Sequence, residues 1–149
     1  MKHFILILTF TLICITSKAH DHNFFNEAKN LFEQAKKKFE KKDYEKSKFL
    51  FQRNIVYNPK NAESYLYLAK IFKIEEDKRQ EEKNIKTTLL LDPKNEEAMF
   101  LLIDMELERS NFSKADELSK DFKKICVDMC EKIASIESRL KDFERKDAS

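Results

Sequence analysis

The chain of 149 residues contains no glycine. Phosphate-cradling loops, nucleophile elbows and tight type I′ hairpins depend on glycine, because glycine adopts positive φ without a steric cost. The absence of glycine therefore argues against enzymes and nucleotide-binding proteins whose sites are built on such turns.

Histidine is nearly as scarce, and none of the three histidines follows His22. A Ser–His or Cys–His nucleophile would have to take its base from the amino-terminal end of the chain. Carboxylates are plentiful, as at Glu81 and Glu82, but they alternate with lysines and arginines at helical spacing, which is typical of a solvated, ion-paired face. We expect the protein not to be an enzyme and to need no cofactor.

Long hydrophobic runs are absent except at the start of the chain, where residues 1–19 are expected to be a secretory signal peptide. The apolar run Phe4–Ile15 rises about 18 Å as a helix, which is too short for a hydrocarbon core of about 30 Å. Ser17 and Ala19 are small, as a signal peptidase requires. We expect a mature chain that begins at His20, exported to the periplasm or secreted, with no membrane association after cleavage; an uncleaved anchor is the alternative.

A mature amino terminus reading His20-Asp21-His22 could hold copper(II) or nickel(II) through the free amine, two backbone nitrogens and the imidazole of His22. The plainer interpretation is a frayed polar terminus that happens to contain histidine. No other metal site is expected.

The excess of positive charge is also confined to the signal segment, which has two lysines and no acidic residue. The chain that follows this segment has 27 basic and 27 acidic side chains and is formally neutral. No Lys/Arg run along the sequence alternates with aromatic residues as a groove for a nucleic-acid strand would need. We therefore expect no nucleic-acid partner.

A repeat dominates the rest of the chain. Asn-Pro-Lys-Asn at residues 58–61 returns as Asp-Pro-Lys-Asn at residues 92–95, and these segments hold the only two prolines. Apolar residues recur at helical spacing on both sides of each segment. The residue before a proline is pushed out of the α region, and Asn61 and Asn95 are good N-caps. The fixed interval between the two copies predicts an all-α solenoid of helix–turn–helix units, with about seven helices and no sheet.

The expected helices follow from these turns. A first helix starts after Asn23, a second runs from Tyr44 to Tyr57, and the rest are Ala62–Glu75, Lys78–Leu91, Glu96–Arg109 and Phe112–Ile125.

The pattern resembles the tetratricopeptide repeat. In that family the first helix of a unit carries a large apolar residue, then an apolar and a small residue three and four places on, then another large residue. The best match is the set Tyr65, Leu68, Ala69 and Phe72. The second helix carries a small residue, an aromatic and a small residue, matched here by Ser47, Phe51 and Asn54 before Pro59.

Other units are more degenerate: Glu81 takes the small-residue slot in the second unit, and in the third unit Ile103 replaces a small residue and Val127 the proline. The resemblance implies a lead-in at 20–27, repeats at 28–61, 62–95 and 96–129, and a capping helix at 130–149. It further implies a non-catalytic adaptor or scaffold whose partner is a protein or peptide.

In the family, the first helices line a concave groove that takes extended peptides. Mapped onto this chain, the groove has an apolar row with one member at the same place in each repeat, Phe32, Leu66 and Phe100, beside Lys36 and Lys70. The full set that the resemblance implies is Phe32, Lys36, Phe39, Leu66, Tyr67, Lys70, Lys73, Phe100, Asp104 and Leu107. The two lysines stand where the family's carboxylate clamp has an asparagine, so binding of chaperone tails is not implied. Alternatively, the amino-terminal segment or a second copy covers the row.

Cys126 and Cys130 remain after removal of the signal segment, and an even pair in an exported chain suggests a disulfide. In an unbroken helix, Cβ atoms four residues apart are about 5–6 Å from each other, whereas a disulfide needs about 3.5–4.5 Å. The repeat period, however, puts a turn at residues 126–129, where the two sulfurs could meet. The alternative is one long helix with two free thiols, because an apolar stripe continues from Leu118 to Phe143 without a break.

A second functional hypothesis assigns a chemical role to the cysteines and to the amino-terminal histidines. The protein could be a small exported redox or metal-handling factor that acts through Cys126 and Cys130 or through His20 and His22. Active dithiols more often have two residues between the cysteines and a βαβ scaffold, for which the sequence shows no strands.

Overall fold

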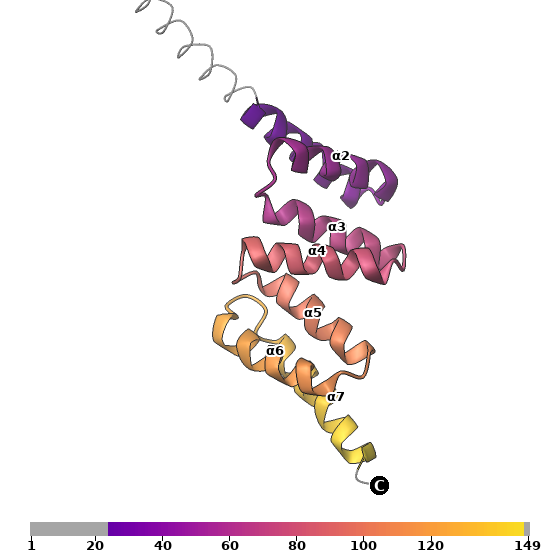
Figure 1. Cartoon of the computed structure of the whole chain (residues 1–149), viewed down its shortest axis with the longest axis vertical. Coiled ribbons are helices and arrows are strands. Elements are labelled where there is room, and N and C mark those ends of the chain that lie inside the picture. The colour runs from indigo at the N-terminus through magenta and orange to yellow at the C-terminus, as the bar shows by residue number, and fades with distance from the viewer. Residues whose placement is uncertain (1–23, 148–149) are drawn as a thin grey trace, which may run out of the picture. The chain divides into compact units, whose positions relative to one another are not determined.

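Residues 24–147 are described by the computed structural model, and within them the chain forms helices joined by short turns, with no strand (Figure 1). The all-α prediction is confirmed for this part of the chain. A helix at residues 24–40 is followed by six more: α2 (Tyr44–Tyr57), α3 (Ala62–Ile74), α4 (Lys78–Leu91), α5 (Glu96–Glu108), α6 (Phe112–Ile125) and α7 (Lys132–Asp147).

The predicted signal peptide at residues 1–19 and the possible metal ligands His20 and His22 lie outside the described residues. Among the helices that are described, none combines the length and the apolar character that crossing a bilayer requires.

Local chemistry explains where the helices begin. The Asn95 side chain accepts a hydrogen bond from the Ala98 N–H at 3.0 Å, and Asn61 caps α3 in the same way through the Ser64 N–H at 3.3 Å. The two asparagines therefore cap their helices as the sequence predicts, each satisfying one of the backbone donors that a helix start leaves unpaired.

The turn inside each helical hairpin has a non-glycine residue at positive φ. Lys42, Glu76 and Ser110 occupy the same place in successive repeats, and all three have a φ of 59°. In the first of these turns the Lys42 N–H donates to the Phe39 carbonyl at 2.9 Å and the Asp43 N–H donates to the Lys38 carbonyl at 3.0 Å. This pair of bonds defines a Schellman motif, and the other two turns repeat it.

The chain divides into two compact units, Met1–Ser64 and Tyr65–Ser149. In unit 1, the helix at residues 24–40 packs on α2 through the rings of Phe32 and Phe51, whose centroids are 5.8 Å apart. The Ser47 hydroxyl donates to the Ala35 carbonyl at 2.9 Å, so the small-residue slot of the first repeat also ties the two helices together.

Unit 2 has a continuous hydrophobic core to which α3, α4, α5, α6 and α7 all contribute. Within it, α5 packs against α4, α6 and α7. Ile85 and Ile103 are completely buried, so the bulky Ile103 is accommodated where the repeat pattern calls for a small residue.

Glu81 departs from its predicted environment. The sequence places it on a solvated face, but only 1% of the residue is exposed. It occupies the small-residue slot of α4, and its Oε2 lies 3.3 Å from the Lys78 Nζ without forming a hydrogen bond. Its neighbour Glu82 is ion-paired with Lys86, four residues on, as the charge pattern predicts, and also with Arg109, which comes from the next repeat.

Candidate functional site

The three predicted groove residues of unit 1 lie on the helix at residues 24–40. Phe32 is only 9% exposed and packs on Phe51, while the Lys36 ammonium lies 5.5 Å from the centre of the Phe32 ring. Phe39 is half-buried and contacts the ring of Tyr44 at 5.5 Å. Lys36 and Phe39 are therefore more accessible to a partner than Phe32 is.

In unit 2, two of the predicted groove residues belong to the hydrophobic core. Leu66 is 6% exposed and Leu107 is 7% exposed. Tyr67 is half-buried, with the Lys70 ammonium 4.8 Å from the centre of its ring, and Phe100 is half-buried against the core. Of the apolar groove residues predicted in this unit, Tyr67 and Phe100 are thus the two that stay partly exposed to a partner.

Ion pairs neutralise the two lysines on this face of unit 2. The Lys70 Nζ lies 2.6 Å from the Glu97 Oε1, and the Lys73 Nζ lies 2.6 Å from the Asp104 Oδ2. Arg139 of α7 donates to the other Asp104 oxygen at 2.6 Å. The repeat pattern does not predict these ion pairs, because the partners come from different repeats.

Partial burial raises the pKa of Asp104, but the hydrogen bonds from Lys73 and Arg139 outweigh it and hold the pKa below its ordinary value. Asp104 therefore stays ionised and links α3, α5 and α7. This face of unit 2 carries fixed, mutually paired charges instead of free cations.

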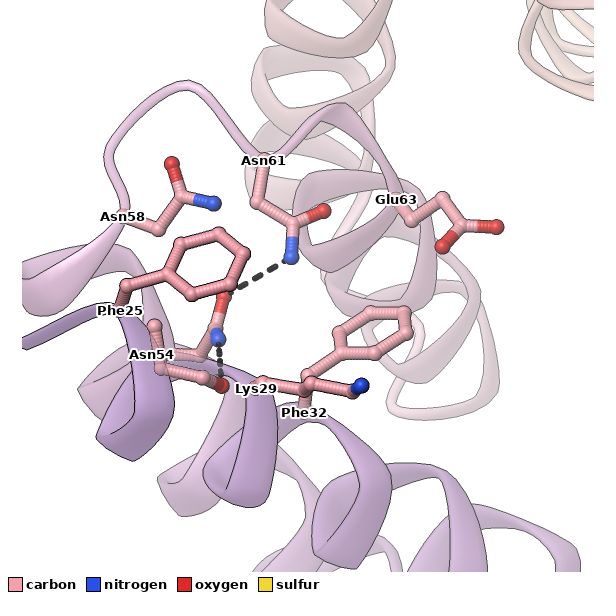
Figure 2. A pocket seen from close by; sticks show the side chains of 8 residues that line it. Phe25, Lys29, Phe32, Asn54, Asn58, Asn61 and Glu63 are labelled. Atoms are coloured by element: carbon pink, nitrogen blue, oxygen red, sulfur yellow. Dashed lines mark hydrogen bonds between the residues drawn. The ribbon is translucent and has the colours of Figure 1, made fainter. Parts of the chain in front are cut away.

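Unit 1 contains a pocket that the sequence pattern does not predict. It has a volume of about 190 Å³, and Figure 2 shows it between Phe25 on one side and Phe32 and Glu63 on the other. The complete lining is Phe25, Ala28, Lys29, Phe32, Asn54, Asn58, Asn61 and Glu63. Phe25 is 65% exposed, so its ring is accessible to a ligand at the edge of the pocket.

A buried amide shapes the floor of this pocket. The Asn54 Nδ2 donates to the Ala28 carbonyl at 2.6 Å, and its Oδ1 accepts from the Asn61 Nδ2 at 3.1 Å (Figure 2). The same Oδ1 also accepts from the Ser64 hydroxyl at 2.7 Å. Asn54 thereby joins the helix at residues 24–40, α2 and the start of α3. The pocket wall is rigid because buried amides with satisfied hydrogen bonds are costly to displace.

At the end of the third repeat, Cys126 and Cys130 form the predicted disulfide, with their Cα atoms 5.3 Å apart. Since α6 ends at Ile125 and α7 begins at Lys132, the alternative of one long helix is wrong. Among the described residues, no group of three or more histidine, cysteine, aspartate or glutamate side chains could hold a metal ion.

The Glu96 carboxylate, at the start of α5, binds the backbone of the same turn. One Glu96 oxygen accepts from the Val127 N–H at 2.8 Å and the other from the Met129 N–H at 2.8 Å, with the Asp128 N–H shared between them. Desolvation raises the pKa of Glu96, but these backbone donors prevail and lower it. The sequence gives no sign of this contact, because it joins segments that are distant along the chain.

Solved structures of tetratricopeptide repeat domains are similar to this chain. The TPR domain of Arabidopsis OM64 has 18% sequence identity and a TM-score of 0.71, with 80% of this chain and 98% of that domain covered. The second TPR domain of human RPAP3, solved with an HSP70 peptide, has 15% identity, a TM-score of 0.68 and coverages of 79% and 98%. The Yersinia enterocolitica type III secretion chaperone SycD, solved with a peptide of the translocator YopD, has 15% identity, a TM-score of 0.68 and coverages of 80% and 93%.

The fold is that of a tetratricopeptide repeat domain. No protein-family model matches the sequence, and no curated protein is similar to it in sequence. The likeness to solved structures therefore concerns the fold, while the repeat boundaries and the binding roles of the ten groove residues stay predictions. The row Phe32, Leu66 and Phe100 is divided between the two units.

Proposed function

We propose that the protein is a non-catalytic adaptor that binds an extended peptide or protein segment on the first helices of its repeats. The observation that carries the proposal is the shared fold, since two of the similar domains were solved with a bound peptide. Each unit offers contacts of its own, and in unit 1 these are Phe32 and Lys36. In unit 2, Tyr67 and Phe100 supply the aromatic contacts. Lys70 and Asp104 supply the polar rim there. Leu66 and Leu107 support this surface from beneath, because both are buried.

We also propose that the protein works outside the cytoplasm. The supporting observations are the predicted signal peptide and the disulfide, which persists in oxidising compartments. Amino-terminal sequencing of exported material tests this part, with His20 as the expected first residue.

The binding function is tested by selecting a random dodecapeptide display library on residues 20–149 with the disulfide formed. We expect enrichment of particular peptides and a weaker affinity for the variant Tyr67→Ala/Phe100→Ala, by about tenfold, because aromatic anchors dominate peptide interfaces. The matched control is Val56→Ala, which removes an apolar side chain that is 77% exposed on the second helix of its repeat. A library that enriches no sequence over an unrelated protein would contradict the proposal.

A further inference from the structure

The first helix of unit 1 carries aromatic and cationic side chains in alternation along one face. We call this the Phe/Lys stripe, and its members are Phe25, Lys29, Phe32, Lys36 and Phe39. The steps between them are four, three, four and three residues, which is the spacing of side chains that share one face of a helix. The pocket of unit 1 opens on this stripe, since Phe25, Lys29 and Phe32 all line it.

The two lysines of the stripe are free of ion pairs within the described part of the chain, unlike Lys70 and Lys73 on the first helix of unit 2. Lys70 is paired with Glu97, and Lys73 is paired with Asp104. From Phe24 to Ser64, unit 1 has ten basic and six acidic residues, while in unit 2 acidic residues outnumber basic ones. An anionic ligand is therefore drawn to unit 1.

The polar wall of the pocket suits a peptide backbone. The Asn61 amide is already engaged with Asn54 and Ser64. The half-buried Asn58 side chain, by contrast, has no hydrogen-bond partner among the described residues. A carboxamide presents N–H donors beside a C=O acceptor, which matches the C=O and N–H of an extended chain. The apolar part of the lining, formed by Phe25, Ala28 and Phe32, suits one large apolar side chain.

We infer that unit 1 is the docking site for an acidic peptide, whose large apolar side chain enters the pocket while its carboxylates contact Lys29 and Lys36. This inference rests on the proposed function and names the partner's chemistry. The two lysines are seven residues apart, about 10 Å along a helix. An extended chain rises about 3.3 Å per residue, so the two carboxylates lie about three residues apart, with the apolar residue between them.

A single-stranded nucleic acid is the other anionic ligand that stacks on aromatic side chains. The pocket disfavours it, because Glu63 lines the pocket and Glu33 lies on the same helix as the stripe. Carboxylates at these positions repel a continuous line of phosphates, whereas a peptide can present neutral or basic residues to them.

The test compares variants for binding to the peptides selected from the dodecapeptide library, using fluorescence anisotropy on residues 20–149 with the disulfide formed. The stripe variant is Lys29→Glu/Lys36→Glu. Its matched control is Lys37→Glu/Lys41→Glu, which makes the same change in charge on exposed lysines that lie off the stripe. A third variant, Phe25→Ala, probes the pocket without touching the buried Phe32, and thermal melting verifies that every variant is folded.

We expect enriched peptides with acidic residues about three apart around a large apolar residue. Their affinity should fall at least about tenfold in the stripe variant, several-fold in Phe25→Ala, and less than about threefold in the control. Peptides without this pattern, or an equal loss in the stripe variant and the control, would overturn the docking site while leaving the adaptor function standing. Tighter binding of a single-stranded oligodeoxynucleotide than of any selected peptide would also overturn it. A library that enriches nothing removes both proposals together.

Discussion

Replacing the three positive-φ residues by glycine should stabilise the protein. Lys42, Glu76 and Ser110 each close a helix in the left-handed region, which costs an L-amino acid roughly 1–2 kcal/mol. Glycine removes this cost but adds about 0.5–1 kcal/mol of backbone entropy to the unfolded chain. All three side chains are exposed, so little packing is lost. The expected net gain is about 0.5–1 kcal/mol for each of Lys42→Gly, Glu76→Gly and Ser110→Gly.

The three turns are separated by a whole repeat, so the gains should add to about 1.5–3 kcal/mol in the triple variant. Urea-induced unfolding followed by circular dichroism measures the difference, with the disulfide formed in every sample. Two controls isolate the backbone effect: Lys42→Ala should leave the free energy of unfolding nearly unchanged, because alanine pays the same steric cost. Lys83→Gly, at an exposed position inside α4, should lower that free energy by about 1 kcal/mol. A triple variant no more stable than the parent would refute the reasoning.

Three further predictions concern the core, the disulfide and pH. Leu66→Ser should lower the free energy of unfolding by about 2–4 kcal/mol in a urea titration, because Leu66 is buried in the core of unit 2. Reducing the bond between Cys126 and Cys130 should lower the free energy of unfolding by about 2 kcal/mol in the same titration, without changing peptide affinity at unit 1. Glu82→Gln should lower the free energy of unfolding by about 1 kcal/mol at neutral pH, a value reduced because solvent screens the partly exposed ion pairs. Hydrogen bonds from Arg109 and Lys86 lower the pKa of Glu82 from 4.5 to about 2. The stabilisation from ionised Glu82 is therefore complete above pH 4.5 and disappears as the pH falls towards 2. The melting temperatures of parent and variant should accordingly converge in acid.

The helices could be predicted from the sequence because their signals are local. Pro59 and Pro93 each end a helix, Asn61 and Asn95 each begin one, and the apolar spacing between them fixes the buried face. The break between α6 and α7 was harder to predict, since neither proline nor glycine marks it. Only the repeat period favoured a turn there over a continuous helix, and the structure confirms the turn.

The candidate sites were less predictable because they depend on contacts between distant segments. The partners of Lys70 and Lys73 come from the next repeat, and the repeat pattern does not specify the charges there. The pattern also fixes which slot Leu66 fills but not how deeply the neighbouring helices cover it. Phe25 precedes the first predicted repeat and was therefore left out of the groove, although its helical spacing with Lys29 could have revealed the Phe/Lys stripe.

The covalent link after α6 has a consequence for how the repeat array opens. Repeat proteins fray from their ends, where a helix has only one neighbouring layer to hold it. In unit 2 the start of α7 is tied to the end of α6 by the disulfide, and the intervening turn is held to α5 by Glu96. The amide protons of Val127 and Met129 should accordingly exchange with solvent slowly even though they belong to a loop. Loss of α7 then requires the turn to leave α5 as well, so local opening at this end becomes a concerted event of three helices instead of the gradual peeling of one.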